Sequence, residues 1–82
     1  MQIIICGAGK SGSSIAEKLS QLGNEVTIID SSPELVKKLT GKLDIRGVVG
    51  HGADPDILER AGADDADMMI AITTTDESNM LA

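Results

Sequence analysis

The sequence predicts an α/β fold in which a parallel β-sheet is flanked by helices. Short apolar segments rich in β-branched residues alternate with segments whose apolar residues recur at helical spacing. The order is β-α-β-α-β-α-β-α, and right-handed crossovers between parallel strands place helices on both faces of the sheet. A chain of 82 residues allows one domain at most. We therefore expect residues 1–82 to be the N-terminal part of a single domain, truncated after its fourth strand.

The first strand and the first helix are the most regular part of the pattern. Gln2–Cys6 is short, apolar and β-branched, which is typical of a strand buried on both faces. Lys10–Leu22 follows as a helix with one apolar face, made of Ile15, Ala16, Leu19 and Leu22. Gly23 predicts the end of this helix, because glycine readily adopts the left-handed conformation that closes many helices.

The second strand is predicted over Glu25–Ile29, and a capped helix follows it. Ser32 and Pro33 favour a helix start, with serine as the N-cap and proline at the first helical position. Gly41 predicts the helix end. The face expected to pack on the sheet consists of Leu35, Val36 and Leu39.

The third strand, Asp44–Val49, is weaker because Arg46 and Gly47 interrupt its apolar run. Asp54–Pro55 repeats the capped start and predicts a third helix. Gly62 predicts the end of that helix. The apolar face of the helix is formed by Ile57, Leu58 and Ala61.

The fourth strand is predicted over Asp67–Ile72, with Met68 and Met69 in the core. Thr74 and Glu77 then have the spacing of a capping box, so a fourth helix is expected to begin there. We expect the strands to lie in the order 3-2-1-4, which places a crevice between the first and the fourth strand.

The loop after the first strand matches the G-x-G-x-x-G pattern of dinucleotide-binding domains, because it reads Gly7-Ala8-Gly9-Lys10-Ser11-Gly12. Gly7 permits a tight turn, Gly9 lets a pyrophosphate approach the backbone, and Gly12 allows the helix to pack close to the strand. The free N–H groups and the positive dipole end of the helix would then face the phosphates. This context predicts a Rossmann-like domain.

Asp30 closes the second strand 18 residues after Gly12. Its carboxylate would accept hydrogen bonds from the ribose hydroxyls and repel a 2′-phosphate, so NAD(H) is favoured over NADP(H). Lys10 either neutralises the phosphates or is simply solvated. The segment is no Walker A motif, because Ile4 stands where that motif requires a glycine.

Residues at the ends of the other strands predict the rest of the site. The crevice would be lined by residues 7–9 and 72–74, where Thr73 either donates to phosphate or ribose or caps the next helix. Gly50 and Gly52 would let the backbone approach the adenine edge. His51 is expected to be an exposed loop residue, because no carboxylate–nucleophile pair accompanies it.

Composition excludes several classes of function. The chain carries 13 acidic and 7 basic residues, and its formal net charge of −6 argues against a nucleic-acid partner. It has no aromatic residue, so bases cannot be recognised by aromatic stacking. Cys6, the only cysteine, excludes an internal disulfide and is expected to be a small core residue. Residues 54–82 carry a net charge of −7, which we interpret as a solvated acidic surface.

Many dehydrogenases share the glycine loop alone. Five segments of this sequence together form a more specific pattern. They are Ile3–Gly12, Val26–Asp30, Val48–Gly52, Asp64–Asp67 and Ala71–Met80. Together they resemble the N-terminal domain of Trk-type potassium-uptake regulatory proteins, the RCK or KTN domain. The resemblance covers essentially all 82 residues.

The resemblance implies a regulatory nucleotide-binding subunit that is not an enzyme. It implies NAD(H), or ATP or ADP in some members, as the ligand, and a membrane-embedded potassium transporter subunit as the partner. It further implies a homo-oligomer in the cytoplasm, peripheral to the inner face of the cell membrane. Such a domain would control potassium uptake through changes in the geometry of its assembly.

The resemblance also implies the roles of individual residues. Asp30 and Ser31 would hold the adenosine ribose, and Gly50 and His51 would flank the adenine. Thr73 and Asp76 would lie toward the distal phosphate or the nicotinamide. The phosphates would be held by Gly7, Ala8, Gly9, Lys10, Ser11 and Gly12.

A second function stays open at this level, the cofactor-binding half of an NAD-dependent dehydrogenase. Its catalytic residues would lie in a further C-terminal domain, and the sequence contains no positioned base and no nucleophile–base pair. No catalytic or metal-binding residue is therefore assigned.

Overall fold

Four parallel strands form one sheet in the order β3-β2-β1-β4 in the computed structural model, which describes residues 1–51 and 54–72. The strands are β1 (Gln2–Cys6), β2 (Glu25–Asp30), β3 (Arg46–Val49) and β4 (Met68–Ala71). The helices are α1 (Lys10–Gln21), α2 (Pro33–Lys42), α3 (Pro55–Arg60) and the 3₁₀ turn η1 (Ala63–Asp65). The predicted α/β class and strand order are confirmed.

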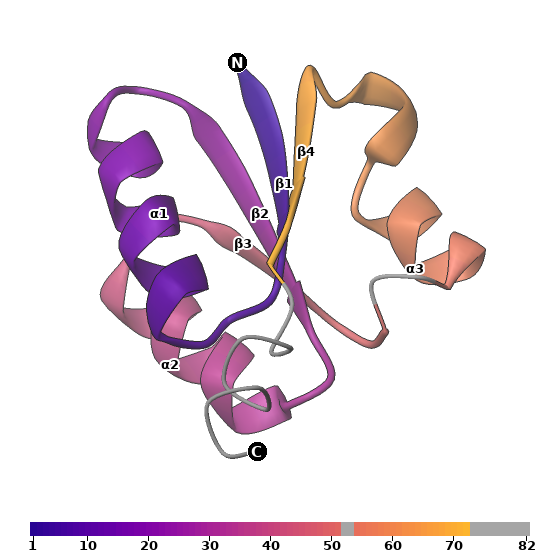
Figure 1. The fold of residues 1–82 in the computed structure, drawn as a ribbon, viewed down its shortest axis with the longest axis horizontal. Coiled ribbons are helices and arrows are strands. Elements are labelled where there is room, and N and C mark those ends of the chain that lie inside the picture. The colour runs from indigo at the N-terminus through magenta and orange to yellow at the C-terminus, as the bar shows by residue number, and fades with distance from the viewer. Residues whose placement is uncertain (52–53, 73–82) are drawn as a thin grey trace, which may run out of the picture.

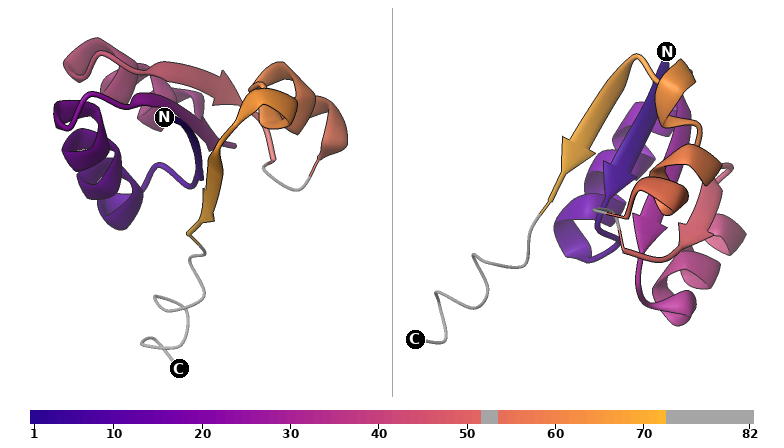
Figure 2. Two further views of the ribbon diagram at one scale, coloured as in Figure 1. Left: turned by 90° about the horizontal axis from the view of Figure 1, so that it is seen from above. Right: turned by 90° about the vertical axis from the view of Figure 1, so that its right-hand side faces the viewer.

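The helices form two layers on opposite faces of the sheet. Figures 1 and 2 show α1 and α2 on one side and α3 with η1 on the other. The connections β1–α1–β2 and β2–α2–β3 step one way along the sheet, whereas α3 and η1 connect β3 back to β4 in the opposite direction. Right-handed crossovers in opposite directions must lie on opposite faces, which explains the two layers.

The core follows the alternation of side chains along the two central strands. Ile3 and Ile5 of β1 are buried beneath α1 and α2, together with Val26 and Ile28 of β2. Alternate residues point to the other face, where a second cluster contains Ile4, Ile29 and Ala61. The central strands are therefore buried on both faces, as their continuous apolar sequences predict.

Two predictions about the ends of the first two helices are wrong. Leu22 was expected on the buried face of the first helix, but it is the C-cap of α1 and is exposed. Gly41 was expected to end the second helix, but α2 continues through it to Lys42. The chain leaves α2 at Leu43 with an extended backbone, so no left-handed glycine is needed there.

The strand β3 is shorter than predicted, and Gly47 within it has a packing role. A Cβ at Gly47 would lie 2.5 Å from Cγ1 of Val36 and 2.7 Å from Cγ2 of Thr40. Helix α2 therefore packs directly onto the backbone of β3, which explains a glycine that weakened the strand signal. The 3₁₀ turn after Gly62 was not predicted, although Gly62 has the expected positive φ of 85°.

The outer strand β4 differs most from the prediction. Met68 and Met69 were expected in the core, but they are 45% and 48% exposed. Within the described residues, β4 pairs with β1 alone. Asp67 fixes its start, because its carboxylate and its N–H both bond to the backbone of Gln2 at 2.8 Å. The predicted capping box of Thr74 and Glu77 lies outside the described residues.

Among the residues that the structure describes, no helix has both the length and the apolar character needed to cross a bilayer.

Candidate functional site

The fold requires glycine at two positions of the turn that joins β1 to α1. Gly7 has a φ of 120°, and a Cβ there would lie 2.7 Å from the carbonyl oxygen of Ile72. A Cβ at Gly12 would overlap the carbonyl oxygen of Gly7. The chain itself therefore demands glycine at both positions, with or without a ligand.

Gly9 is different, because none of the residues that the structure describes crowds it. Its φ is −71°, which any residue can adopt, and a Cβ added there would meet no atom within 4 Å. No side chain of the described residues occupies the space beside this position. Steric contacts within the described chain thus give no reason for glycine at this position.

The amino end of α1 lacks the capping that the other two helices have. Ser32 accepts a hydrogen bond at the start of α2 and Asp54 at the start of α3, and each of these helices carries an acid in its first turn. At α1, Gly9 provides no side-chain cap, and the first turn contains no acid. The free N–H groups and positive dipole end of α1 are therefore available to an anion. Lys10 and Ser11 are exposed at this end.

Asp30, the last residue of β2, reaches the glycine turn directly. Its Oδ2 accepts a hydrogen bond from the N–H of Ala8 at 2.8 Å. Its Oδ1 accepts one from the N–H of Ser32 at 2.8 Å. Each carboxylate oxygen has a further acceptor site, so the group can still accept hydrogen bonds from a ligand's hydroxyl groups.

The same residue also connects to the loop after β3. The main-chain carbonyl of Asp30 accepts a hydrogen bond from Gly50 at 2.9 Å. Asp30 thus holds three segments together: the glycine turn, the start of α2 and the loop that contains His51. Ser31, the neighbouring candidate, is exposed.

Gly50 and His51 lie where β3 ends, beside Asp30. A Cβ at Gly50 would lie 2.5 Å from Cδ1 of Ile57, so α3 packs closely against this loop. His51 is exposed, and its carbonyl accepts a hydrogen bond from Asp54 at 3.0 Å. The structure therefore brings Gly7–Gly12, Asp30 and Gly50 together at the carboxyl edge of the sheet. Gly52, Thr73 and Asp76 lie outside the described residues.

Cys6 precedes the turn and is only partly buried. Desolvation by burial raises the pKa of its thiol, so the neutral form dominates near neutral pH and the group is a poor nucleophile. Over residues 1–51 and 54–72, no cluster of three or more His, Cys, Asp or Glu side chains is arranged to hold a metal ion.

The contacts of Asp30 with the chain's own backbone were not predicted. The bond to Ser32 joins residues i and i+2, which is an Asx turn, and the Asp-Ser-Ser sequence is a usable signal for it. The bond to Ala8 spans 22 residues, and no local signal could have indicated it.

Comparison with known proteins shows which sequences and which fold the chain is similar to. The sequence model of the TrkA-N domain matches residues 3–82. The Trk system potassium uptake proteins TrkA of Azorhizobium caulinodans and Vibrio alginolyticus are 54% and 49% identical to the whole chain. The chain covers 18% of the length of each of these two relatives. TrkA of Streptomyces coelicolor is 38% identical, and the chain covers 37% of it.

A solved structure has the same fold. The structure described as Shewanella denitrificans Kef CTD in AMP bound form superposes with a TM-score of 0.76 and 32% sequence identity. The match covers 96% of this chain and 47% of that one.

Proposed function

Because the chain belongs to the TrkA-N domain family, we propose that it is a regulatory domain that binds NAD(H) or an adenine nucleotide and thereby controls a prokaryotic potassium uptake system. The bond between Asp30 and Ala8 carries this proposal. It brings the acid that would read a ribose into contact with the turn that would hold the phosphates. The AMP-bound state of the Kef relative supports the same class of ligand.

In this proposal the phosphates lie over Gly9 and against the amino end of α1. The open space at Gly9 allows close approach, and the uncapped N–H groups supply donors along the helix dipole. Lys10 and Ser11 add an exposed cation and a hydroxyl at the same end. Ala8 and Gly12 are buried and form the part of the turn that faces the protein interior.

The adenosine would lie along the edge formed by β2 and β3. The free acceptor sites of Asp30 would bind the ribose hydroxyls, with the exposed Ser31 beside them. The same carboxylate would repel a 2′-phosphate, which favours NAD(H) over NADP(H). Gly50 and His51 would flank the adenine.

The far part of the ligand would extend toward β4. Ile72 lies against Gly7 at that end of the sheet. We assign Thr73 and Asp76 to the distal phosphate or nicotinamide side from the family resemblance alone. ATP and ADP are included as ligands on the same basis.

Regulation requires that the nucleotide bind two conformations with different affinity. The relatives are potassium uptake proteins by name, so we propose a membrane-embedded potassium transporter subunit as the partner. A homo-oligomer at the inner face of the cell membrane would transmit the change in geometry. The 82 residues would form the N-terminal part of one nucleotide-binding domain in this assembly, and that domain would bind no nucleic acid.

This role needs no catalytic residue, and that separates it from the dehydrogenase alternative. The half-buried Cys6 has a raised pKa, and the hydrogen bond recorded for the exposed His51 among the described residues is made by its main-chain carbonyl. The relatives named above are uptake proteins, which favours the regulatory role.

Thermal unfolding with and without ligand tests the proposal. NADH or AMP at about 100 times its dissociation constant should stabilise the chain by about 2.7 kcal/mol. For a domain of this size that raises Tm by about 10 °C or more. NADPH should give a smaller shift than NADH at equal concentration. The absence of any shift at millimolar NADH, AMP, ADP and ATP would overturn the proposal.

A further inference from the structure

A small polar cavity of about 120 Å³ lies at the amino end of the sheet, beside the turn between α3 and η1. Its lining includes Gln2, Glu25 and Arg46, the first residues of β1, β2 and β3, together with Thr27 and Asp65. Figure 1 shows the amino ends of β1 and β4 at the opposite end of the sheet from the turn that precedes α1. No described residue of the proposed nucleotide site lines this cavity, so it is a separate feature of the fold.

Strand pairing explains why these polar side chains share one face. Gln2 pairs with Glu25. Thr27 pairs with Ile4 on one side and with Arg46 on the other. Paired residues point to the same side of a sheet, as do residues two apart along one strand. This is the side beneath α3, because Ile4 packs in the cluster that α3 covers. Helix α3 has only six residues, and the amino end of this face remains a cavity.

The Thr27 hydroxyl group opens into this cavity. Thr27 is buried, with only 8% of its surface exposed. None of the side-chain hydrogen bonds recorded among residues 1–51 and 54–72 involves its hydroxyl. In the same part of the chain, no fully enclosed polar side-chain atom lacks a partner, so this hydroxyl is not sealed in the core. It is therefore a donor and acceptor available to a molecule in the cavity.

Charges of both signs line the cavity. Arg46 belongs to β3, whereas Asp65 belongs to η1, which leads into β4. Because β2 and β1 separate β3 from β4, these two exposed side chains approach the cavity from opposite sides. The carboxylates of Glu25 and Asp65 would repel a simple anion, and the guanidinium of Arg46 would repel a simple cation. A ligand with one charge of each sign avoids both penalties.

We propose that this cavity binds a small zwitterion, an α-amino acid of the size of glycine or alanine. Its carboxylate would accept hydrogen bonds from Arg46 and from the Thr27 hydroxyl, and its ammonium group would donate to Glu25 and Asp65. The volume equals that of about four water molecules, which limits the ligand to a few non-hydrogen atoms. The site needs no nucleotide, so its failure would leave the proposed function untouched, and the reverse also holds.

Amide NMR of the ¹⁵N-labelled chain, titrated with glycine and with L-alanine, tests the proposal. We expect saturable shifts centred on Thr27, Gly62 and Asp65, with a dissociation constant of about 1–10 mM for at least one of the two. Sodium acetate and methylammonium chloride each carry one half of the zwitterion and should bind at least about tenfold more weakly. No saturable shift with either amino acid at about 50 mM, or acetate binding as tightly as the amino acid, would overturn the proposal.

Two pairs of variants locate the ligand in the cavity. R46Q should weaken binding at least about tenfold, because it removes the charge that faces the carboxylate. R60Q is the matched control, since Arg60 is exposed on α3 and does not line the cavity. T27V removes the hydroxyl and should weaken binding about threefold or more, whereas T27S keeps the hydroxyl and should restore it. The amide spectrum verifies that each variant folds. Equal affinities of R46Q and R60Q would overturn the assignment, even if T27V failed to fold.

Discussion

Asp30 stabilises the fold of the site, in addition to its predicted contact with a ribose. Each of its carboxylate oxygens accepts a backbone N–H at 2.8 Å, one from the glycine turn and one from the start of α2. Hydrogen bonds to a charged acceptor contribute about 1.5–3 kcal/mol each. Asp30 therefore fixes the shape of the site before any ligand arrives, which reduces the entropy that binding must overcome.

Replacement of Asp30 by asparagine tests this role without a ligand. Asparagine can accept one of the two bonds but presents an amide N–H to the other donor. We expect D30N to lower the free energy of unfolding by about 1–3 kcal/mol, measured by urea denaturation of the free chain. Asp44 is exposed, so D44N is the control. It should change the free energy of unfolding by less than about 0.5 kcal/mol. Equal effects of the two substitutions would contradict the role of Asp30.

Gly9 and Gly12 allow a contrast between binding and folding. Serine at position 9 meets open space and is a good N-cap, so G9S should keep or slightly raise stability. It should weaken NADH binding at least about tenfold, by calorimetric titration, since the side chain occupies the place proposed for phosphate.

In G12A the clash with the Gly7 carbonyl outweighs the gain of about 1 kcal/mol in helix propensity. That variant should lose about 3 kcal/mol of stability. If G9S bound NADH as tightly as the parent chain, phosphate would not lie over Gly9.

The raised pKa of Cys6 predicts its reactivity. Only the thiolate is alkylated, and a raised pKa lowers the thiolate fraction at any pH below it. Iodoacetamide should therefore react with the folded chain more slowly at pH 8 than with the urea-unfolded chain, and the pH profile should shift upward. Equal rates in the two states would show that burial does not affect this thiol.

At the scale of elements, close backbone contacts position the helices on the sheet. Helix α2 begins at a serine cap and packs on the bare backbone of Gly47. Helix α1 begins at the glycine turn and can approach β1 because Gly12 lacks a side chain. These two contacts fix the two helices that flank the candidate site.

Replacement by alanine should have opposite effects on stability at Gly47, on which α2 packs, and at Gly41, which lies within α2. In G47A the new methyl group would meet Val36 and Thr40 at 2.5 and 2.7 Å, and we expect a loss of about 1–3 kcal/mol. In G41A it meets nothing within 4 Å and improves helix propensity, which should add up to about 1 kcal/mol. Urea denaturation measures both, and a stabilised G47A would contradict the close packing of α2 on β3.

The helices and strands and their order could be predicted from the sequence, because the alternation of strand-like and helix-like segments, the helix caps and the glycine turns are local signals. Ser32 and Asp54 were identified as caps on that basis, and the structure places them so. Exposure was harder to predict. Met68 and Met69 look apolar enough for a core, but β4 has one partner strand within the described residues. Whether a strand is central or outer depends on partners that its own residues do not specify.

The candidate site was also predictable only where its signals are local in the sequence. The glycine pattern and the terminal acid of β2 were evident from spacing, and the structure brings them together. The bond from Asp30 to Ala8 and the groove between α1 and α2 were not predictable. Both depend on how segments far apart in sequence pack, and neither leaves a periodic or compositional signal.

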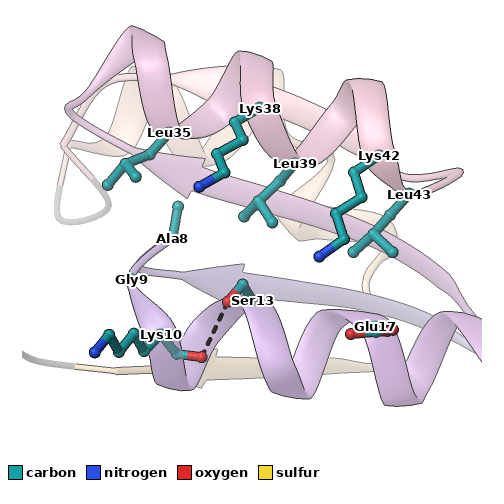
Figure 3. Close-up of a pocket in the computed structure, with 10 residues that line it drawn as sticks. All are labelled: Ala8, Gly9, Lys10, Ser13, Glu17, Leu35, Lys38, Leu39, Lys42 and Leu43. Atoms are coloured by element: carbon teal, nitrogen blue, oxygen red, sulfur yellow. Dashed lines mark hydrogen bonds between the residues drawn. The ribbon is translucent and has the colours of Figure 1, made fainter.

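For the whole molecule, the proposed nucleotide site shares the glycine turn with a groove between α1 and α2, because Ala8, Gly9 and Lys10 also line that groove (Figure 3). A nucleotide over Gly9 would therefore place negative charge at a groove that Lys38 and Lys42 also line. The fold therefore brings the proposed phosphate position and two lysines of α2 to one groove.

The central claim is that a nucleotide binds over the amino end of α1, next to Asp30. A titration of the ¹⁵N-labelled chain with AMP, followed by two-dimensional amide NMR, tests it most directly. We predict saturable shifts that are largest for the amides of Gly9, Lys10 and Ser11, with further shifts at Ser31 and Gly50. No saturable shift, or shifts centred on α3 and η1 instead, would contradict the account.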